Sequence, residues 1–289
     1  MGEQGCKADM GDGAAVVDTC GYPVETTGNA VLDILEHRSS TRAFARDDND
    51  RPVAVTDEQR AAILHAASRA PSAGAMMMYS IVSIREQARL DRLADLCDHQ
   101  PMIAKAPWAL IFVVDYAKWI DLFEHVGCFK PEFVERTGKS PRRAPGLGDF
   151  AIAAQDAVIA AQNAVVAAEA LGLGSCYIGD VIENAEEVAA LLDLPPYTMP
   201  LSMLIIGTPR KERPAIAHPV VNLVHEERYR RADTATMDAQ VAEMDAMFRP
   251  HAREVGERVV DIYTRKHTSP FMAEMSRSME WWFKNWLGK

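Results

Sequence analysis

The sequence predicts a domain of the α/β or α+β class, in which strands alternate with helices along the chain. Residues 79–84, 109–114 and 201–207 are short, largely apolar runs, which is the pattern of buried strands. The segments between them carry apolar residues at helical spacing instead. Alternation of this kind is typical of a sheet that packs against helices.

The chain begins with a segment that lacks the periodicity of a core element. Residues 1–28 are rich in Gly, Asp and Thr, and we interpret them as an N-terminal arm. The arm carries Cys6 and Cys20, to which the sequence assigns no role.

Two helices are predicted between the arm and the first strand. Apolar residues recur at helical spacing from Ala30 onward, at Val31, Leu32, Ile34 and Leu35. The second helix begins at Thr56, which can form a capping box with Gln59. A further helix is expected over residues 86–97, before the second strand. That strand is a continuous apolar run, as found where both faces of a strand are covered.

The segment from Asp149 to Leu171 is predicted to be a long helix that is packed with alanine. So much small apolar surface indicates burial on more than one face. It is either a core helix of one chain or a helix at the centre of a dimer. Gly172 and Gly174 are expected to end it. The short strand SCYIGD and a helix over residues 185–192 follow.

Residues 116–148 form a long excursion before the alanine-rich helix. It carries positive residues, prolines and the aromatic residues Trp119, Phe123 and Phe129. The excursion is either a surface loop or a lid over a site.

The tail is helical by pattern from Thr234 onward, and its last helix begins with Ser269 as N-cap and Pro270 at the first position. This helix carries three tryptophans, Trp281, Trp282 and Trp286. They need an apolar surface, which either the chain's own body or a partner subunit would supply.

Composition restricts the class of protein. With 289 residues, 48% hydrophobic residues and a net charge of -10, the chain is typical of a globular protein that does not bind nucleic acid. A phosphate-bearing ligand would need a local group of positive residues. Five cysteines without CxxC spacing argue against a disulfide framework or a structural zinc site and favour the reducing cytoplasm. The longest clean apolar run, residues 108–114, is too short to span a membrane.

Two positive groups stand out, while the sequence lacks the GxSxG, HExxH, GxxxxGK[ST] and GxGxxG motifs. The segment HRSSTRAF, residues 37–44, offers Arg38 and Arg42 with two serines between them, a set that can hold a phosphate. The alternative is that these are helix-capping and solvated residues. The second group, Arg210, Lys211 and Arg213, follows the strand over 201–207.

Taken together, these segments resemble the nitroreductase family of flavin mononucleotide (FMN) enzymes. The motifs are RSSTRAF, APSAG, DAVIAAQNAVVAAEALGLGSCYIGD and LSMLIIGTP with its basic stretch, over roughly residues 30–230. The segments VVNLVHEERY and RKHTSPFMAEMSRSMEWW resemble the C-terminal extension of one branch of the family. The resemblance implies an FMN-binding domain over residues 29–232 and a C-terminal helical extension over residues 233–289.

The resemblance further implies an α+β fold with a mixed sheet flanked by helices, assembled as an intertwined homodimer with two FMN sites at the subunit interface. The residues that match the phosphate and ribityl contacts are Arg38, Ser39, Ser40 and Arg42, with Lys211 or Arg213 as the second basic contact. Ile178 and Gly179 match the place where main chain approaches the flavin near N5, and glycine suits a close approach.

One stretch departs from the family pattern. Where many members have Asn and Gln, whose side-chain amides help to hold the flavin, this chain has Ala75 and Met77. The three methionines at 76–78 either pack against the edge of the flavin pocket or fill a gap in the core.

The implied activity is a ping-pong oxidoreduction in which NAD(P)H gives hydride to the flavin and a small acceptor then takes its place. Nitroaromatics and quinones are the expected acceptors, and Trp119, Phe123 and Phe129 are candidates for stacking on them. The catalytic side chains are left unassigned, because the flavin carries the chemistry, and no metal is expected. The alternatives are a flavin-binding or redox-responsive dimer without nicotinamide turnover, and a reductive dehalogenase or enoate reductase on the same fold.

Overall fold

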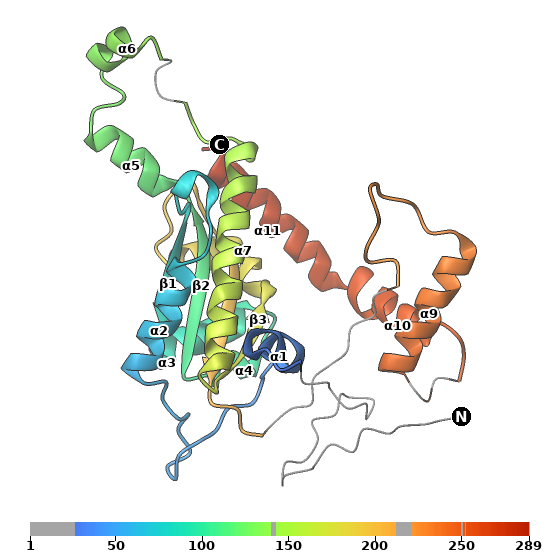
Figure 1. Cartoon of the computed structure of the whole chain (residues 1–289). Coiled ribbons are helices and arrows are strands. Elements are labelled where there is room, and N and C mark those ends of the chain that lie inside the picture. The colour runs from blue at the N-terminus through green and yellow to red at the C-terminus, as the bar shows by residue number, and fades with distance from the viewer. Residues whose placement is uncertain (1–26, 140–142, 212–220, 250, 252, 289) are drawn as a thin grey trace. The chain divides into compact units, whose positions relative to one another are not determined.

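The computed structural model of the chain describes residues 27–139, 143–211, 221–249, 251 and 253–288 (Figure 1). The chain divides into two compact units. The main unit comprises residues 38–213 and 260–289, and the second unit comprises residues 1–37 and 214–259. Most of the predicted N-terminal arm, including both of its cysteines, lies outside the described residues.

A four-stranded sheet in the order β1-β2-β4-β3 forms the centre of the main unit. Its strands are β1 (Tyr79–Ile84), β2 (Trp108–Asp115), β3 (Gly174–Ile178) and β4 (Thr198–Gly207). Each neighbouring pair is antiparallel, and an isolated bridge between Ser40 and Ser175 adds a parallel pairing beside β3. The strands predicted from apolar runs are therefore confirmed.

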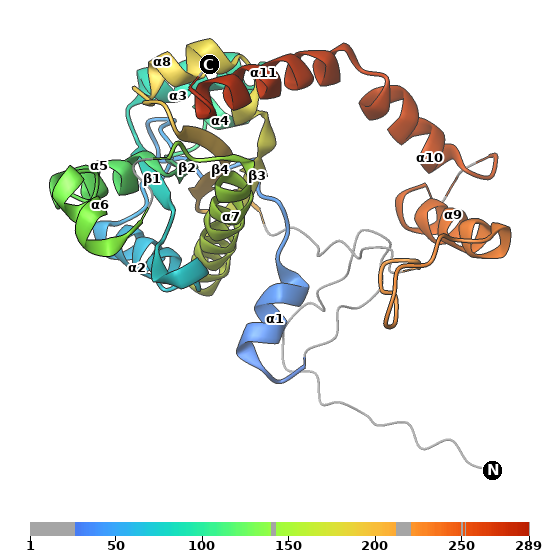
Figure 2. The ribbon, with the colours of Figure 1, turned by 90° about the horizontal axis from the view of Figure 1, so that it is seen from above.

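Helices pack on both faces of this sheet (Figure 2). One face is covered by α2 (Asp57–Ser68) and α7 (Leu147–Ala170). The other is covered by α3 (Gln87–Leu96), α4 (Pro101–Ala104), α8 (Ala185–Leu191) and α11 (Pro270–Trp286). Alternate residues of β2 enter the two cores and all eight of its residues are buried, as the continuous apolar run predicted.

The alanine-rich helix α7 packs tightly because its buried residues are small. Six alanines are fully buried on it, namely Ala153, Ala157, Ala160, Ala161, Ala164 and Ala168. Gly172, with φ 72°, ends the helix in the left-handed conformation that glycine tolerates. The expectation that Gly174 also ends it was wrong, because Gly174 is the first residue of β3.

Among the described residues, one helix, α7, has the length and apolar composition that crossing a bilayer would require. Its packing is that of a core helix, because it contacts α2, β2 and β4. Part of its surface remains apolar and exposed, at Leu147, Ile152, Val158 and Ile159.

The predicted excursion between β2 and α7 contains two helices, α5 (Ala117–His125) and α6 (Pro131–Thr137). It ends at the N-cap of α7, where Asp149 accepts a hydrogen bond from Gly146 N (2.8 Å). Arg143 pairs with both carboxylate oxygens of Asp149 (2.7 and 2.8 Å). This guanidinium lowers the pKa of Asp149 through hydrogen bonding.

The C-terminal helix α11 belongs to the main unit, and two of its three tryptophans pack there. Trp282 and Trp286 are fully buried in the chain's own body. Trp282 Nε1 donates to Ile182 O (2.9 Å), and Trp286 Nε1 donates to Gly146 O (3.1 Å). Both indole N–H groups are thus satisfied, as buried tryptophans require.

The second unit contains α1 (Ala30–His37), α9 (Thr234–Phe248) and the start of α10 (Glu257–Ile262). Asp233 caps α9 by accepting a hydrogen bond from Thr236 N (2.8 Å). Every residue of α1 and α9 is at least partly exposed, including the apolar residues Val31, Leu32, Leu35 and Met237. These helices therefore carry apolar side chains that this chain leaves accessible.

Candidate functional site

The RSSTRAF segment is fastened between β3 and the residues that follow β4. Thr41 N donates to Ser175 O in β3 (2.8 Å). Arg210 N donates to Ala43 O (3.0 Å), so the chain after β4 runs beside the segment. Main-chain bonds of this kind fix the backbone of residues 38–44 against the sheet.

Two glycines allow this close approach. A Cβ added at Gly174 would lie 2.1 Å from Thr41 Oγ1, and one added at Gly207 would lie 2.8 Å from Cδ1 of Phe44. Real Cβ atoms do not approach other atoms so closely, hence both positions need glycine. Gly174 thus allows the RSSTRAF segment to approach β3 and does not end α7.

The two positive groups that the sequence predicted separately meet in this arrangement. Arg210 pairs with Ala43 through the main chain. Arg42 is the neighbour of Ala43, and Lys211 is the neighbour of Arg210, so the pairing brings the two segments that carry them together. Lys211 is exposed at the end of this strand-like pairing. Arg213 lies outside the described residues.

Arg38 begins the segment with an unused donor. Its Nε is buried and has no hydrogen-bond partner among the residues that the structure describes, and the same holds for Glu169 Oε1 on α7. Burial raises the pKa of Glu169 to about 7, with Arg38 acting in the opposite direction. Ser39 and Ser40 follow and are half-buried. An anion bound here would satisfy the Arg38 donor.

The end of β3 presents accessible main chain. Ile178 is buried and pairs with Met203 of β4, and η2 (Gly179–Ile182) follows directly. A Cβ added at Gly179 would meet no described atom within 4 Å, so a ligand can approach this backbone closely. Gln100 Nε2 donates to Asp180 Oδ2 (2.8 Å) and helps to hold η2.

The loop over residues 72–78 has an unusual backbone, with η1 (Ala73–Ala75) at its centre. Gly74, Ala75 and Met77 have φ values of 58°, 55° and 46°. The left-handed region costs about 1–2 kcal/mol for a residue with a Cβ, and asparagine tolerates it better than most. Ala75 thus has a backbone conformation that suits asparagine. Asparagine is also the residue that the family resemblance implies at this position.

The three methionines of this loop differ in environment. Met78 is buried in the core at 4% exposure, Met76 packs against that core, and Met77 is 45% exposed. Filling the core therefore accounts for Met78 and part of Met76. Met77 is accessible to a ligand.

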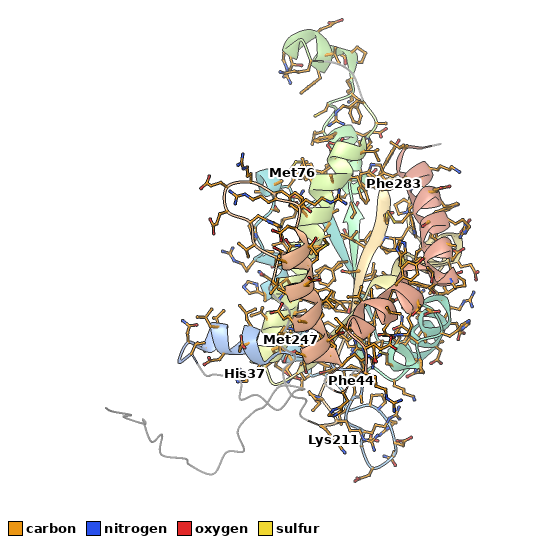
Figure 3. All side chains as sticks on the ribbon, turned by 90° about the vertical axis from the view of Figure 1, so that its right-hand side faces the viewer. His37, Phe44, Met76, Lys211, Met247 and Phe283 are labelled. Atoms are coloured by element: carbon orange, nitrogen blue, oxygen red, sulfur yellow. The ribbon has the colours of Figure 1, made fainter. Side chains whose placement is uncertain are left out.

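Within one chain, this loop does not meet the RSSTRAF segment. Figure 3 shows Met76 and Lys211 at opposite ends of the main unit, with Phe44 beside Lys211. The loop joins β1 at Tyr79, whereas Lys211 follows β4 at Gly207. Strands of this length, at about 3.3 Å per residue, separate the two groups by about 20 Å along the sheet.

The aromatic residues predicted to contact an acceptor form one cluster. Trp119 and Phe123 have ring centroids 5.6 Å apart, and Phe123 and Phe129 are 6.3 Å apart. Trp119 Nε1 donates to Met76 O (2.9 Å), which joins the cluster to the 72–78 loop. The structure therefore brings together the loop and the predicted acceptor residues.

Sequence reasoning missed Asp156, which lies on the buried side of α7 at 2% exposure. It accepts hydrogen bonds from Ala73 N (3.0 Å) and Met78 N (3.3 Å) of the loop. A carboxylate within an otherwise alanine-rich helix was the available signal, because a buried charge requires partners.

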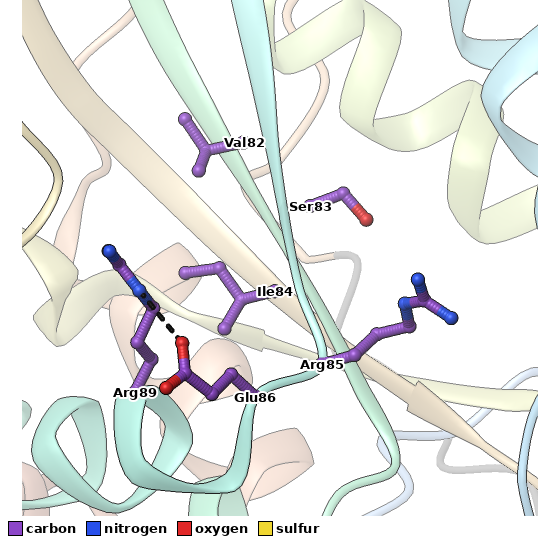
Figure 4. Close-up of a pocket in the computed structure, with 6 residues that line it drawn as sticks. All are labelled: Val82, Ser83, Ile84, Arg85, Glu86 and Arg89. Atoms are coloured by element: carbon purple, nitrogen blue, oxygen red, sulfur yellow. Dashed lines mark hydrogen bonds and ion pairs between the residues drawn. The ribbon is translucent and has the colours of Figure 1, made fainter.

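A pocket of about 320 Å³ lies elsewhere, at the junction of β1 and α3 (Figure 4). Its lining includes Arg85, Glu86 and Arg89, and Arg89 pairs with Glu86 (3.2 Å). These segments carry no predicted site residue. Within the described parts of the chain, His, Cys, Asp and Glu form no group that could hold a metal ion.

Comparison with known families identifies the chain as a member of the nitroreductase family. The family match covers residues 35–208 and includes the RSSTRAF segment, the 72–78 loop, α7 and the whole sheet.

Similar proteins of known name support this assignment. The chain is 33% identical to an FMN reductase [NAD(P)H] of Bacillus subtilis, over 73% of this chain and 79% of that protein. It is 32% identical to an oxygen-insensitive NADPH nitroreductase of Salmonella typhimurium, over 73% and 81%. The solved structure of the NADPH:FMN oxidoreductase from Vibrio harveyi, complexed with NAD+, has a TM-score of 0.66 at 25% identity and covers 86% of this chain and 97% of that one.

Proposed function

We propose that this protein is an FMN-dependent oxidoreductase that takes hydride from NAD(P)H and reduces nitroaromatic, quinone or related small acceptors. The observation that carries the proposal is the pairing of Arg210 with Ala43, which gathers the basic residues of two distant segments in a chain of net charge -10. The names of the similar proteins point to the same chemistry.

The residues of the site fit FMN. Arg38 Nε is a buried donor without a described partner, which suits a phosphate oxygen. The space beside Gly179 is open to the edge of a flat ring. We therefore assign the phosphate to Arg38, Ser39, Ser40 and Arg42 with Lys211 or Arg213, and the ring to the main chain at Ile178 and Gly179.

The chemistry that FMN supplies when bound is two-electron transfer by way of hydride, first from NAD(P)H and then to the acceptor, in a ping-pong scheme. The chain binds and orients the flavin, and the aromatic cluster of Trp119, Phe123 and Phe129 offers ring faces to an acceptor. Changing Phe123 and Phe129 to Ala should raise acceptor KM severalfold more than it raises nicotinamide KM.

We further propose a homodimer in which each flavin lies between two subunits. The RSSTRAF segment and the loop with Ala75 and Met77 lie at opposite ends of one sheet, so one flavin would contact both only if the loop came from the partner subunit. The exposed apolar residues of α7, such as Val158 and Ile159, give such a dimer a surface to bury. The alanine-rich helix would then pack in the core of its own chain on one side and against the partner subunit on the other.

The domain arrangement and location follow the same proposal. Along the sequence, we assign the FMN-binding domain to residues 29–232 and the helical extension to residues 233–289. In space, α11 of this extension belongs to the main unit. Cys97 and Cys128 are free thiols, which suits the cytoplasm.

The test of this function compares FMN binding and NAD(P)H oxidation in charge variants. Arg42→Ala should weaken FMN binding about tenfold or more, since a charge-assisted hydrogen bond to phosphate is lost. Arg51→Ala is the matched control, because Arg51 is an exposed arginine that pairs with Asp47. Equal affinities in both variants and the unchanged protein would contradict the proposed site.

One observation favours a second function, a flavin-binding dimer without nicotinamide turnover. Ala75 and Met77 lack the amides that hold the flavin in many relatives, so the site can bind FMN and still be a poor catalyst. Bound FMN together with NADPH and NADH that remain unoxidised would support this alternative.

A further inference from the structure

We propose that Asp156 is a positioning residue for the flavin, which sets the conformation of the 72–78 loop from the buried side of α7. This inference rests on the proposed function, because the loop matters to catalysis only if it contacts FMN. Asp156 itself is 2% exposed and does not face a ligand. It acts through the backbone that it holds.

The contacts of Asp156 join the two ends of the loop. Oδ1 accepts from Ala73 N (3.0 Å), and Oδ2 accepts from Met78 N (3.3 Å). Both carboxylate oxygens are thus used, and the residues between these two amides form the turn. A buried carboxylate without such donors would be strongly destabilising, so the loop and Asp156 stabilise one another.

The turn needs an external clamp because its backbone is strained. Ala75 and Met77 both adopt left-handed φ values, 55° and 46°. Such residues persist only where their surroundings fix them. Ser72 Oγ, which accepts from Met77 N (3.1 Å), and Trp119 Nε1, which donates to Met76 O, complete the clamp.

A positive side chain also lies near Asp156. Lys118, at the start of α5, is half-buried; burial lowers its pKa, while Asp115 and Asp156 act in the opposite direction. Its ammonium donates to Tyr79 O, directly after the loop. Asp156 thus ties the loop to α7, the helix that we assign to the dimer core.

The test uses Asp156→Asn, which keeps the shape but turns one acceptor into a donor that faces a backbone N–H. The matched control is Asn163→Ala, which removes a bond from the same helix to Ala66 O (3.1 Å) without touching the loop. Amide exchange is measured first, on the protein without FMN. We expect faster exchange at Ala73 and Met78 in Asp156→Asn only.

FMN binding is measured next. Asp156→Asn should weaken it about tenfold, the loss that corresponds to one buried hydrogen bond. At saturating FMN, the midpoint potential and visible absorption bands of the bound flavin should shift in Asp156→Asn and stay unchanged in Asn163→Ala. Adding Ala75→Gly should restore part of the affinity in Asp156→Asn, because glycine adopts the left-handed φ without strain.

The outcomes separate this inference from the proposed function. If the unchanged protein binds FMN and Asp156→Asn has the same affinity, spectrum and potential, the role of Asp156 is overturned and the proposed function stands. If the unchanged protein does not bind FMN, the proposed function falls and the flavin role of Asp156 falls with it. Amide exchange then still shows whether Asp156 holds the loop.

Discussion

The φ values of Ala75 and Met77 give these two residues a meaning that their side chains alone do not have. Both lie in the left-handed region, where a Cβ is unfavourable and asparagine is tolerated. An alanine at this position loses both a side-chain amide and a favourable backbone preference. The departure from the family pattern is thus a change in loop energetics, and we propose that it also changes the contacts with the flavin.

We therefore expect Ala75→Asn together with Met77→Gln to tighten FMN binding about tenfold, since two amide hydrogen bonds are gained. Fluorescence titration of free FMN measures the dissociation constant. Ala73→Asn is the control, because it places the same amide in the loop at a residue outside the left-handed region. An unchanged constant in the double variant would show that these amides do not reach the flavin.

Glu169 gives the protein a pH-dependent stability. Burial raises its folded-state pKa to about 7, above the ordinary value of 4.5. Between pH 4.5 and 7, the native state therefore holds a proton on Glu169 that the unfolded state releases. The contribution of Glu169 to stability is complete below pH 4.5 and is lost as pH rises through 7.

Glu169→Gln should remove this dependence. Relative to the unchanged protein, the variant should gain about 1 kcal/mol in unfolding free energy at pH 8, a value reduced by solvent screening at this partly exposed group. At pH 5 the gain should be much smaller, because folded Glu169 is mostly protonated there. Denaturant unfolding at both pH values measures the difference. If the unfolding free energy of the two proteins differed by the same amount at pH 5 and pH 8, the raised pKa of Glu169 would be refuted.

At the scale of elements, the junction of the RSSTRAF segment with β3 depends on a missing side chain. Gly174→Ala would place a Cβ 2.1 Å from Thr41 Oγ1, and Thr41 is buried. We expect a loss of about 1–3 kcal/mol in unfolding free energy from overpacking, together with weaker FMN binding.

Gly148→Ala provides the contrast for that substitution. A Cβ there meets no described atom within 4 Å, and the residue lies in α7, so alanine should stabilise by up to about 1 kcal/mol. Thr41→Ala in the Gly174→Ala background should restore part of the stability. Equal effects of the two glycine substitutions on unfolding would exclude a close contact at Gly174.

The elements that the sequence predicted are those whose signals are local. The capping box of Thr56 and Gln59 is present in the structure, and the fully buried β2 follows from its continuous apolar run. Main-chain contacts between distant segments have no such signal. The pairing of Arg210 with Ala43 and the bonds from Asp156 to the loop depend on the tertiary fold, and composition did not reveal them.

The candidate site was predictable in the same limited way. The resemblance supplied its residues. The structure pairs Ala43 with Arg210, the neighbours of Arg42 and Lys211, but places the 72–78 loop at the other end of the sheet. The left-handed backbone at Ala75 could not be inferred either, because alanine carries no turn signal.

At the scale of the whole molecule, the proposed dimer accounts for apolar surface that one chain leaves accessible. Val158 on α7 is 48% exposed, and a charge at this position would be desolvated in an interface. Val158→Glu should therefore weaken dimerisation about a hundredfold, equivalent to about 3 kcal/mol.

Sedimentation velocity distinguishes the 31.9 kDa chain from a species of twice that mass. Val158→Ala, which shortens the same side chain without adding a charge, is the matched control and should leave the dimer largely intact. A protein that sediments as a monomer before any substitution would remove the argument for a shared flavin site.

The proposed function is tested by an anaerobic absorption spectrum of the FMN-loaded protein, recorded during addition of NADPH and then NADH. We expect a bound flavin whose visible bands bleach after about one equivalent of one of these donors, because hydride transfer carries two electrons. A flavin that stays oxidised with both donors, or a protein that retains no FMN, would contradict it.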